Sequence, residues 1–290
     1  MKQQLIECVP NFSEGRDLAI IKQITNEIES VDGVKLLDVD PGAATNRTVV
    51  TFVGTPEAVI EAAYKAIVKA GEIIDMSKHK GEHARMGATD VCPLIPVANI
   101  SMEETSQWAV KLAKKVGETT HIPTYLYGAS QEDTKRNVLS IIRAGEYEGF
   151  FEKIKRPEWK PDFGPSIYSA RSGATVIGAR DFLIAYNINL NTTSTRIANR
   201  IAFDVRETGR VVREGNPFTG KIKTDEYGEP VRIPGTCKAV QAVGWYIDEY
   251  KVAQVSANLT NFNITPIHTF FDAVQDSCIE RGVRITGSEL

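Results

Sequence analysis

The chain has 290 residues, enough for one large domain or two modest ones, each with its own buried core. Hydrophobic residues make up 42% and charged residues 24%, which is ordinary for a globular protein and argues against a disordered chain. The formal net charge is −3, so no basic excess is present to neutralise a phosphate backbone. We therefore expect no nucleic-acid binding.

Membrane insertion and disulfide chemistry are also disfavoured. No stretch of about 18 apolar residues occurs in the sequence, and the N-terminus lacks an apolar run long enough for a signal peptide. The four cysteines are scattered without a CxxC pair, which matches neither a disulfide framework nor a zinc ribbon. We expect reduced, mostly buried thiols in a cytoplasmic protein.

The first part of the chain predicts alternating strands and helices. Thr55, followed by proline and glutamate, is a typical helix start, with an N-cap threonine and a proline at the first helical position. Hydrophobic periodicity predicts, in chain order, a strand at 5–10, a helix at 18–28, strands at 34–39 and 48–53, a helix at 56–74 and a strand at 91–97. This βαββαβ order is that of a ferredoxin-like fold.

After an extension, the same order of elements occurs again. The extension contains a helix at 102–116, a strand at 124–127, a polar helix and an irregular region at 145–159. The repeat predicts a strand at 182–190, a helix at 193–205, strands at 237–247 and 252–259, a helix at 266–279 and a strand at 283–286. Residues 206–234 are polar and glycine-rich, and predict an exposed loop or lid.

We therefore predict an α+β protein of two ferredoxin-like (βαββαβ) subdomains that arose by internal duplication, residues 1–180 and residues 181–290. Their sheets are expected to face each other across a substrate cleft, because ligand sites favour domain interfaces.

One short loop, before the predicted strand at 91–97, concentrates titratable side chains. It contains His79, Glu82, His83 and Arg85, and such a dense set beside a strand end is a candidate site. The spacing H-x-x-E-H fits an inverted zincin motif, which requires a helix so that both histidines face one zinc ion. The second hypothesis is acid–base catalysis by one histidine, whose charged form a nearby carboxylate favours. An ordinary solvated loop is the third.

Two further polar clusters accompany this loop. Residues 38–47 form a tight connection between two adjacent strands, which by itself favours an ordinary hairpin loop. Residues 162–180 contain glycines, small hydroxyl side chains and two arginines just before a strand, which suits contact with an anion or a ring. The alternative is an interdomain linker. No P-loop and no clean G-x-G-x-x-G occurs there, so nucleotide binding is weakly supported.

At these segments the sequence resembles the formiminotransferase domain of the formiminotransferase-cyclodeaminase family. The resemblance covers nearly the whole chain, and its run GEHARMGATDVCP is long and specific. The matching stretches are ECVPNFSEG (7–15), LLDVD (36–40), TNRTV (45–49), TFVG (51–54), IDMSKHKGEHARMGATDVCPLIPV (74–97), YLYG (125–128), PDFGPS (161–166), GATVIGAR (173–180), FLIAYNINL (182–190), VQAVGWYIDE (240–249) and AQVSANLTNF (253–262).

The resemblance implies transfer of the formimino group from N-formimino-L-glutamate to tetrahydrofolate, as in histidine degradation, with 5-formiminotetrahydrofolate and L-glutamate as products. It places the family's catalytic histidine on His83 and its nearby acidic residue on Asp40. The folate-contacting stretch falls on Gly164, Pro165, Ser166, Ile167, Tyr168, Ser169, Ala170, Arg171, Ser172 and Gly173. The resemblance also suggests a homodimer, and we expect no metal and no membrane partner. No cyclodeaminase part is expected.

Charge complementarity extends these assignments. The transferred amidine is cationic, so Asp40 and Glu82 suit it as partners. Both substrates carry carboxylates, for which the candidate segments offer Arg47, Arg85 and Arg171. Three alternatives remain open: an N-formylglutamate donor on the same scaffold, a folate-binding protein without turnover, and a zinc hydrolase that uses the H-x-x-E-H motif.

Overall fold

The computed structural model describes residues 2–81, 83–216 and 219–290, and divides the chain into two compact units. Unit 1 is Met1–Arg180 and unit 2 is Asp181–Leu290. Each unit has its own hydrophobic core, and no buried residue belongs to both clusters among the described residues. Every residue of the candidate loop lies in unit 1.

Unit 1 is a mixed sheet with helices. Its strands are β1 (Leu5–Cys8), β2 (Asn11–Phe12), β3 (Val34–Gly42), β4 (Arg47–Gly54), β5 (Thr89–Ala98), β6 (Thr124–Gly128) and β7 (Thr175–Ala179). Its helices are α1 (Leu18–Glu29), α2 (Pro56–Ile73), α3 (Met102–Thr120), α4 (Leu139–Arg143) and α5 (Glu146–Lys153), with short 3-10 turns at Met76–Lys78 and Pro157–Trp159. The first strand is broken in two, and β1 and β2 both lie between β4 and β5.

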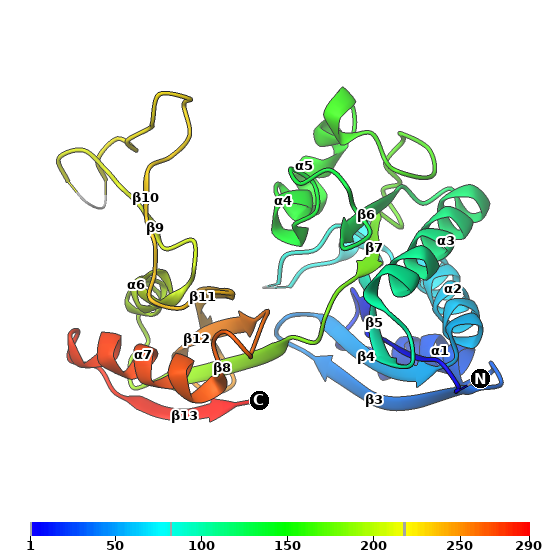
Figure 1. The fold of residues 1–290 in the computed structure, drawn as a ribbon, viewed down its shortest axis with the longest axis horizontal. Helices are drawn as coiled ribbons and strands as arrows, with labels where there is room; N and C mark the ends of the chain where they lie inside the picture. The colour runs from blue at the N-terminus through cyan, green and yellow to red at the C-terminus, as the bar shows by residue number, and fades with distance from the viewer. Residues whose placement is uncertain (1, 82, 217–218) are drawn as a thin grey trace. The chain divides into compact units, whose positions relative to one another are not determined.

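The sheet of unit 1 is antiparallel at one end and parallel at the other. β3 pairs with β4 at the antiparallel edge, while β7 lies between β5 and β6 and is parallel to both. Figure 1 shows α1, α2 and α3 side by side along the sheet. Local sequence fixes their starts: Asp17 caps α1, and Ser101 forms a capping box with Glu104 at α3.

The opposite face of β4 carries the polar side chains that matter for the site. Along β4, Thr48, Val50 and Phe52 are fully buried, whereas the alternating residues that begin with Arg47 are only partly buried. Asp40 of β3 lies directly across from Val49, so it shares a face with Arg47. The alternation therefore presents an acidic and a basic residue on the sheet face that the core does not cover.

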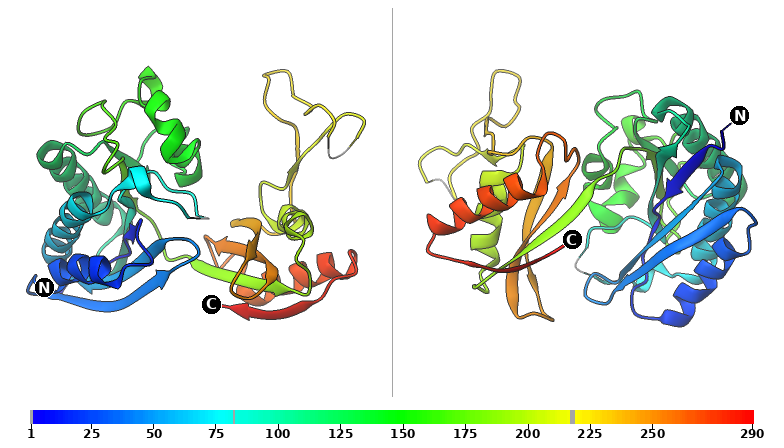
Figure 2. Two further views of the ribbon diagram at one scale, coloured as in Figure 1. Left: turned by 180° about the vertical axis from the view of Figure 1, so that it is seen from behind. Right: turned by 60° about the horizontal axis from the view of Figure 1, so that its bottom comes forward.

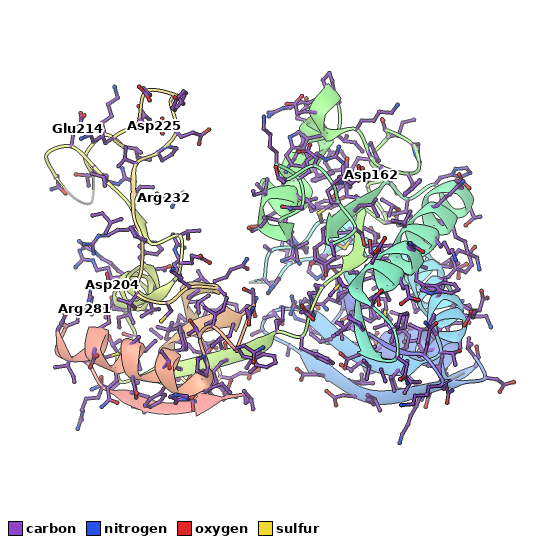
Figure 3. All side chains as sticks on the ribbon, viewed as in Figure 1. Asp162, Asp204, Glu214, Asp225, Arg232 and Arg281 are labelled. Carbon is purple, nitrogen blue, oxygen red and sulfur yellow. The ribbon has the colours of Figure 1, made fainter. Side chains whose placement is uncertain are left out.

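Unit 2 repeats part of this pattern. Its main elements are β8 (Ile184–Leu190), α6 (Thr195–Val205), β11 (Val240–Ile247), β12 (Val252–Leu259), α7 (Ile267–Ile279) and β13 (Ile285–Glu289). The sheet order is β11-β12-β8-β13, and α6 and α7 lie on one side of it (Figure 2). Asp204 of α6 pairs with Arg281, which follows α7; both are labelled in Figure 3. The described residues of 206–234 are largely exposed, as predicted, and include β9 (Arg210–Val211) and β10 (Arg232–Ile233).

The structure confirms an α+β protein, but one predicted loop was wrong. Residues 162–180 do not form a loop or linker throughout, because Thr175–Ala179 is the buried strand β7. Gly178 fits there because a Cβ at this position would meet the Tyr127 carbonyl oxygen at 2.1 Å. All four cysteines are free and buried, as expected, and the sulfurs of Cys8 and Cys92 are 3.5 Å apart. Among the described residues, no helix is long and apolar enough to cross a membrane.

Candidate active site

The loop that carries His83 is held closely against two neighbouring segments. It begins after the 3-10 turn at Met76–Lys78 and reaches β5 at Thr89. A Cβ on Gly81 would meet the Thr45 carbonyl oxygen at 2.2 Å, and one on Gly87 would meet that of Ala174 at 2.1 Å. Only glycine permits this close packing of backbone on backbone.

Asn46 fixes one side of this loop. Its backbone has a positive φ of 49°, a conformation that asparagine tolerates better than most residues. Its side-chain nitrogen donates to the Lys80 carbonyl at 3.0 Å, and its side-chain oxygen accepts from the Gly15 N–H at 3.0 Å. Its own carbonyl oxygen lies 2.8 Å from Nε2 of His79. The connection between β3 and β4 thus positions the start of the loop.

The His83 ring is bound on both of its nitrogens. Nδ1 lies 2.6 Å from the Ala84 carbonyl oxygen, which can only accept a hydrogen bond. Nδ1 therefore carries the proton of a neutral ring, and Nε2 holds the lone pair. Nη1 of Arg47 lies 2.8 Å from Nε2 and donates to it. The structure therefore shows a neutral imidazole whose basic nitrogen is covered by a guanidinium.

The electrostatics of His83 differ from the sequence-based expectation. We predicted carboxylate neighbours that favour the charged ring, but among the described residues the charges that act on it are those of Arg47 and Arg143. Burial and these two cations lower the pKa of His83 to about 3. Asp40 is exposed on β3, and its charge acts on Arg47 instead. Glu82, the other predicted acidic neighbour, lies outside the described residues.

A buried ion pair stands beside this histidine. Asp90, near the start of β5, is fully buried and lies 2.5 Å from Nη2 of Arg143, the last residue of α4. Asp90 also accepts from the Met86 N–H at 3.0 Å, so it ties the loop to α4. Lys153 in turn holds the end of α4, since its Nζ donates to the Ile142 carbonyl at 2.7 Å. No sequence pattern indicated a role for Arg143, because only the folded chain brings it close to the loop of His83.

Arg85 is engaged by carboxylates of the protein itself. Its guanidinium donates to Glu146 at 3.0 Å and to Glu148 at 2.7 Å, and its Nε donates to Nδ1 of His79 at 3.3 Å. Nδ1 of His79 accepts this bond while Nε2 faces the Asn46 carbonyl, the arrangement of a neutral ring, and burial lowers the pKa of His79. The predicted substrate arginine Arg85 thus joins the loop to α5.

The predicted folate-contacting stretch begins with an exposed limb, Gly164–Ile167, and continues into a turn that is anchored by hydrogen bonds to the loop of His83. Within Gly164–Ile167, the side chains of Ser166 and Ile167 are exposed, the latter by 75%. In the turn that follows, the hydroxyl of Tyr168 donates to the Met86 carbonyl at 2.5 Å, and burial raises the pKa of Tyr168. The Ala88 N–H donates to the Ser172 carbonyl at 2.8 Å. The structure therefore brings this stretch against the loop of His83.

Arg171, at the tip of that turn, is exposed and donates to the Glu72 carbonyl near the end of α2 at 2.7 Å.

The helix that a zincin motif requires is not present, because the described residues between Lys78 and Thr89 are not helical. Each histidine of H-x-x-E-H has both ring nitrogens occupied by other groups, His79 by Asn46 and Arg85 and His83 by Ala84 and Arg47. These contacts argue against the zinc hydrolase alternative.

Family models match both units. A model described as "Formiminotransferase domain, N-terminal subdomain" matches residues 5–180. A second, described as "Formiminotransferase domain", matches residues 185–290.

Several curated proteins are similar over almost the entire chain. The sequence is 40% identical to the glutamate formimidoyltransferase of Thermoplasma acidophilum over 288 residues, which cover 99% of this chain and 86% of that protein. It is 35% identical to the protein of the same name from Streptococcus pyogenes, over 99% of this chain and 88% of that protein. It is also 48% identical to the formimidoyltransferase-cyclodeaminase of Mus musculus, but spans only 49% of that longer protein.

Proposed function

The chain belongs to the formiminotransferase domain family, and we propose that it is a glutamate formimidoyltransferase. Its similarity to transferases of that name extends over 99% of the chain. The observation that carries the proposal is the position of His83. A neutral imidazole stands on a loop that is hydrogen-bonded to the stretch expected to contact folate, which suits proton transfer at a folate nitrogen.

In the proposed reaction, N5 of tetrahydrofolate attacks the amidine carbon of N-formimino-L-glutamate and a C–N bond forms. The bond from that carbon to the glutamate nitrogen then breaks, releasing L-glutamate. N5 must lose a proton and the leaving amine must gain one. His83 takes the first proton on Nε2 and returns it to the leaving amine, a contribution of about 10²–10⁴-fold in rate.

The charged side chains are assigned to two parts of the donor, its cationic amidine and its carboxylates. We assign Asp40 to the cationic amidine, since its carboxylate is exposed on the same sheet face as Arg47. Glu82 keeps the same proposed role. We assign a donor carboxylate to Arg47 rather than to Arg85, because Glu146 and Glu148 already bind the Arg85 guanidinium.

The exposed limb of Gly164–Gly173 is proposed to contact the folate. Gly164 has a φ of +84°, and a Cβ there would meet the Ile122 carbonyl oxygen at 2.9 Å, so glycine is needed to hold this limb in place. The anchored turn fixes the limb relative to the loop of His83. Individual folate contacts within 167–172, including Arg171, are proposals of the same kind.

Finer features of the family are proposed here as well. Both units have the strand order second–third–first–fourth for their βαββαβ elements, which supports two ferredoxin-like subdomains from one duplication. We also propose a role in histidine degradation, a cytoplasmic location and a homodimer, all from the family resemblance.

The test is transferase activity of purified protein with N-formimino-L-glutamate and tetrahydrofolate. We expect His83→Asn to lower kcat by about 10²–10⁴-fold while folate affinity changes little. The control is His121→Asn, because His121 is exposed at the C-cap of α3 with a φ of 58°, where asparagine fits equally well.

Near-normal turnover in His83→Asn would remove His83 from the mechanism. N-formyl-L-glutamate is assayed in parallel as donor. Transfer from the formyl compound alone would replace the formimino assignment and leave the role of His83 intact.

A further inference from the structure

Arg47 donates a hydrogen bond to Nε2 of His83, the atom that must accept a proton in the proposed reaction. Its Nη1 lies 2.8 Å from Nε2, and 3.3 Å from Nδ1 of the same ring. A lone pair that accepts a hydrogen bond from a guanidinium cannot at the same time take a proton from a substrate. The ligand-free protein therefore holds its proposed base in a blocked state.

Arg47 itself is a cation without a close anionic partner among the described residues. Within the described parts of the chain, no carboxylate lies within ion-pair distance of it. Asp90 is already used by Arg143 and by the Met86 N–H. Burial lowers the pKa of Arg47 to about 10, and the charge of Arg143 acts in the same direction, while Asp90 and Asp40 oppose it.

Among the described residues, the buried charges around His83 therefore do not balance. The described groups that act on the ring or on its arginine are Arg47 from β4, Arg143 from α4, Asp90 from β5 and Asp40 from β3. Of the two acids only Asp90 is buried, and it is bound to Arg143. A partly buried arginine with no counter-ion attracts a carboxylate of a ligand, to which its planar fork is complementary.

We propose that Arg47 is a substrate-displaced gate on His83. A carboxylate of a small dicarboxylate ligand, such as the glutamate part of the donor, draws the Arg47 guanidinium away from Nε2 and pairs with it. Arg143 remains on Asp90 and supplies the second positive charge of this anion subsite. The inference rests on the proposed function, since it names how that site recognises its donor.

The gate has a chemical consequence. Once Arg47 leaves and its charge is neutralised, the lone pair on Nε2 is free and the ring no longer faces an unpaired cation. Loss of the Arg47 charge raises the pKa of the imidazole, although burial and Arg143 still lower it, and the freed lone pair can take a proton. The acceptor nitrogen is thus deprotonated only when the donor is bound, so the donor binds productively before the chemical step.

The first experiment measures the gate without turnover. NMR of the His83 imidazole in the full chain follows its titration with and without saturating L-glutamate. We expect glutamate to raise the pKa of His83 from about 3 toward the ordinary 6.5. In Arg47→Gln the pKa without glutamate is expected to be higher than in the wild type, although burial and Arg143 still lower it, and glutamate is expected to change it little further.

The matched control is Arg136→Gln. Arg136 is another partly buried arginine, but its Nη2 pairs with a carboxylate, that of Asp162, at 3.0 Å; Asp162 is labelled in Figure 3. Asp162 keeps the Leu126 N–H and Gln131 as partners in that variant. Because Arg136 does not act on His83, its loss should leave both the pKa of His83 and the glutamate response unchanged.

Kinetics supply the second readout. Arg47→Gln should raise the KM of the donor by roughly 10–100-fold and leave the KM of tetrahydrofolate within about twofold, because a charge-assisted carboxylate contact is lost. A pKa of His83 in Arg47→Gln that is no higher than in the wild type, or glutamate binding that leaves the wild-type pKa unchanged, would overturn the gate. Absence of glutamate binding would overturn the subsite. If glutamate raises the pKa but no transfer to tetrahydrofolate occurs, the proposed function fails and the gate stands.

Discussion

His83 is held neutral by the fold, and this has a consequence for stability. Burial and two arginines lower its pKa to about 3 in the folded chain, whereas the unfolded chain binds the proton with an ordinary pKa of 6.5. Between these values the unfolded state carries more protons than the folded one. The free energy of unfolding therefore rises with pH in this window, and the contribution of neutral His83 is fully present only above about pH 6.5.

We accordingly expect acid to destabilise the protein through this one residue. Linkage predicts a loss of roughly 2 kcal/mol in the free energy of unfolding between about pH 7 and pH 5. His83→Asn removes the titrating group, so its stability difference from the wild type should change by that amount over the same interval. Urea unfolding at several pH values measures it. A difference that does not vary with pH would show that His83 titrates normally in the folded chain.

At the scale of elements, two loops from distant parts of the chain form one unit. Tyr168 and Ser172 bond to the loop of His83, and the backbones of Gly87 and Gly173 form a bridge between them. A Cβ on Gly173 would meet the Met86 carbonyl oxygen at 2.2 Å, so neither glycine tolerates a side chain. The proposed folate stretch and the proposed base are therefore positioned by the same contact.

Gly87→Ala tests this coupling. The added methyl group forces the two backbones apart, and overpacking of this kind costs about 1–3 kcal/mol of stability. We expect turnover and folate affinity to fall together. Gly149→Ala is the control, because nothing lies within 4 Å of its Cβ position in α5, and alanine should stabilise that helix by roughly 0.5–1 kcal/mol. Loss of turnover with unchanged folate affinity in Gly87→Ala would separate the two loops.

The sequence predicts those elements whose pattern is local. The start of α2 at Thr55 and Pro56 and the alternation of β4 were predicted correctly, because a proline in the first helical turn and periodicity act within a few residues, although the Thr55 side chain makes no capping hydrogen bond. Strand β7 was not predicted, because its glycine and small residues indicate a strand only when the neighbouring strands β5 and β6 are known. Asp90 stands between the loop of His83 and the predicted strand at 91–97, but its ion pair with Arg143 spans 53 residues and had no local pattern.

At the scale of the whole molecule, the chain is two separately cored units with the same strand order. The cluster of unit 1 is built from β1 to β7 and their helices, and that of unit 2 from β8, β11, β12 and their helices. The hydrophobic periodicity of the sequence predicted the succession of strands and helices that both units show. The topology of the sheet requires this order of elements, whereas the individual core residues need only fill the volume of each core.

All described residues that set the state of His83 lie in unit 1, from Asp40 to Gly173. We therefore expect residues 1–180 to fold when expressed alone, because no described core residue is shared with unit 2. The isolated segment should unfold cooperatively, and its His83 should titrate with the same low pKa as in the full chain. Circular dichroism and NMR measure these two properties, with residues 181–290 as the reciprocal control. A cooperatively folded segment with an ordinary pKa of 6.5 for His83 would show that unit 2 contributes to the environment of the ring.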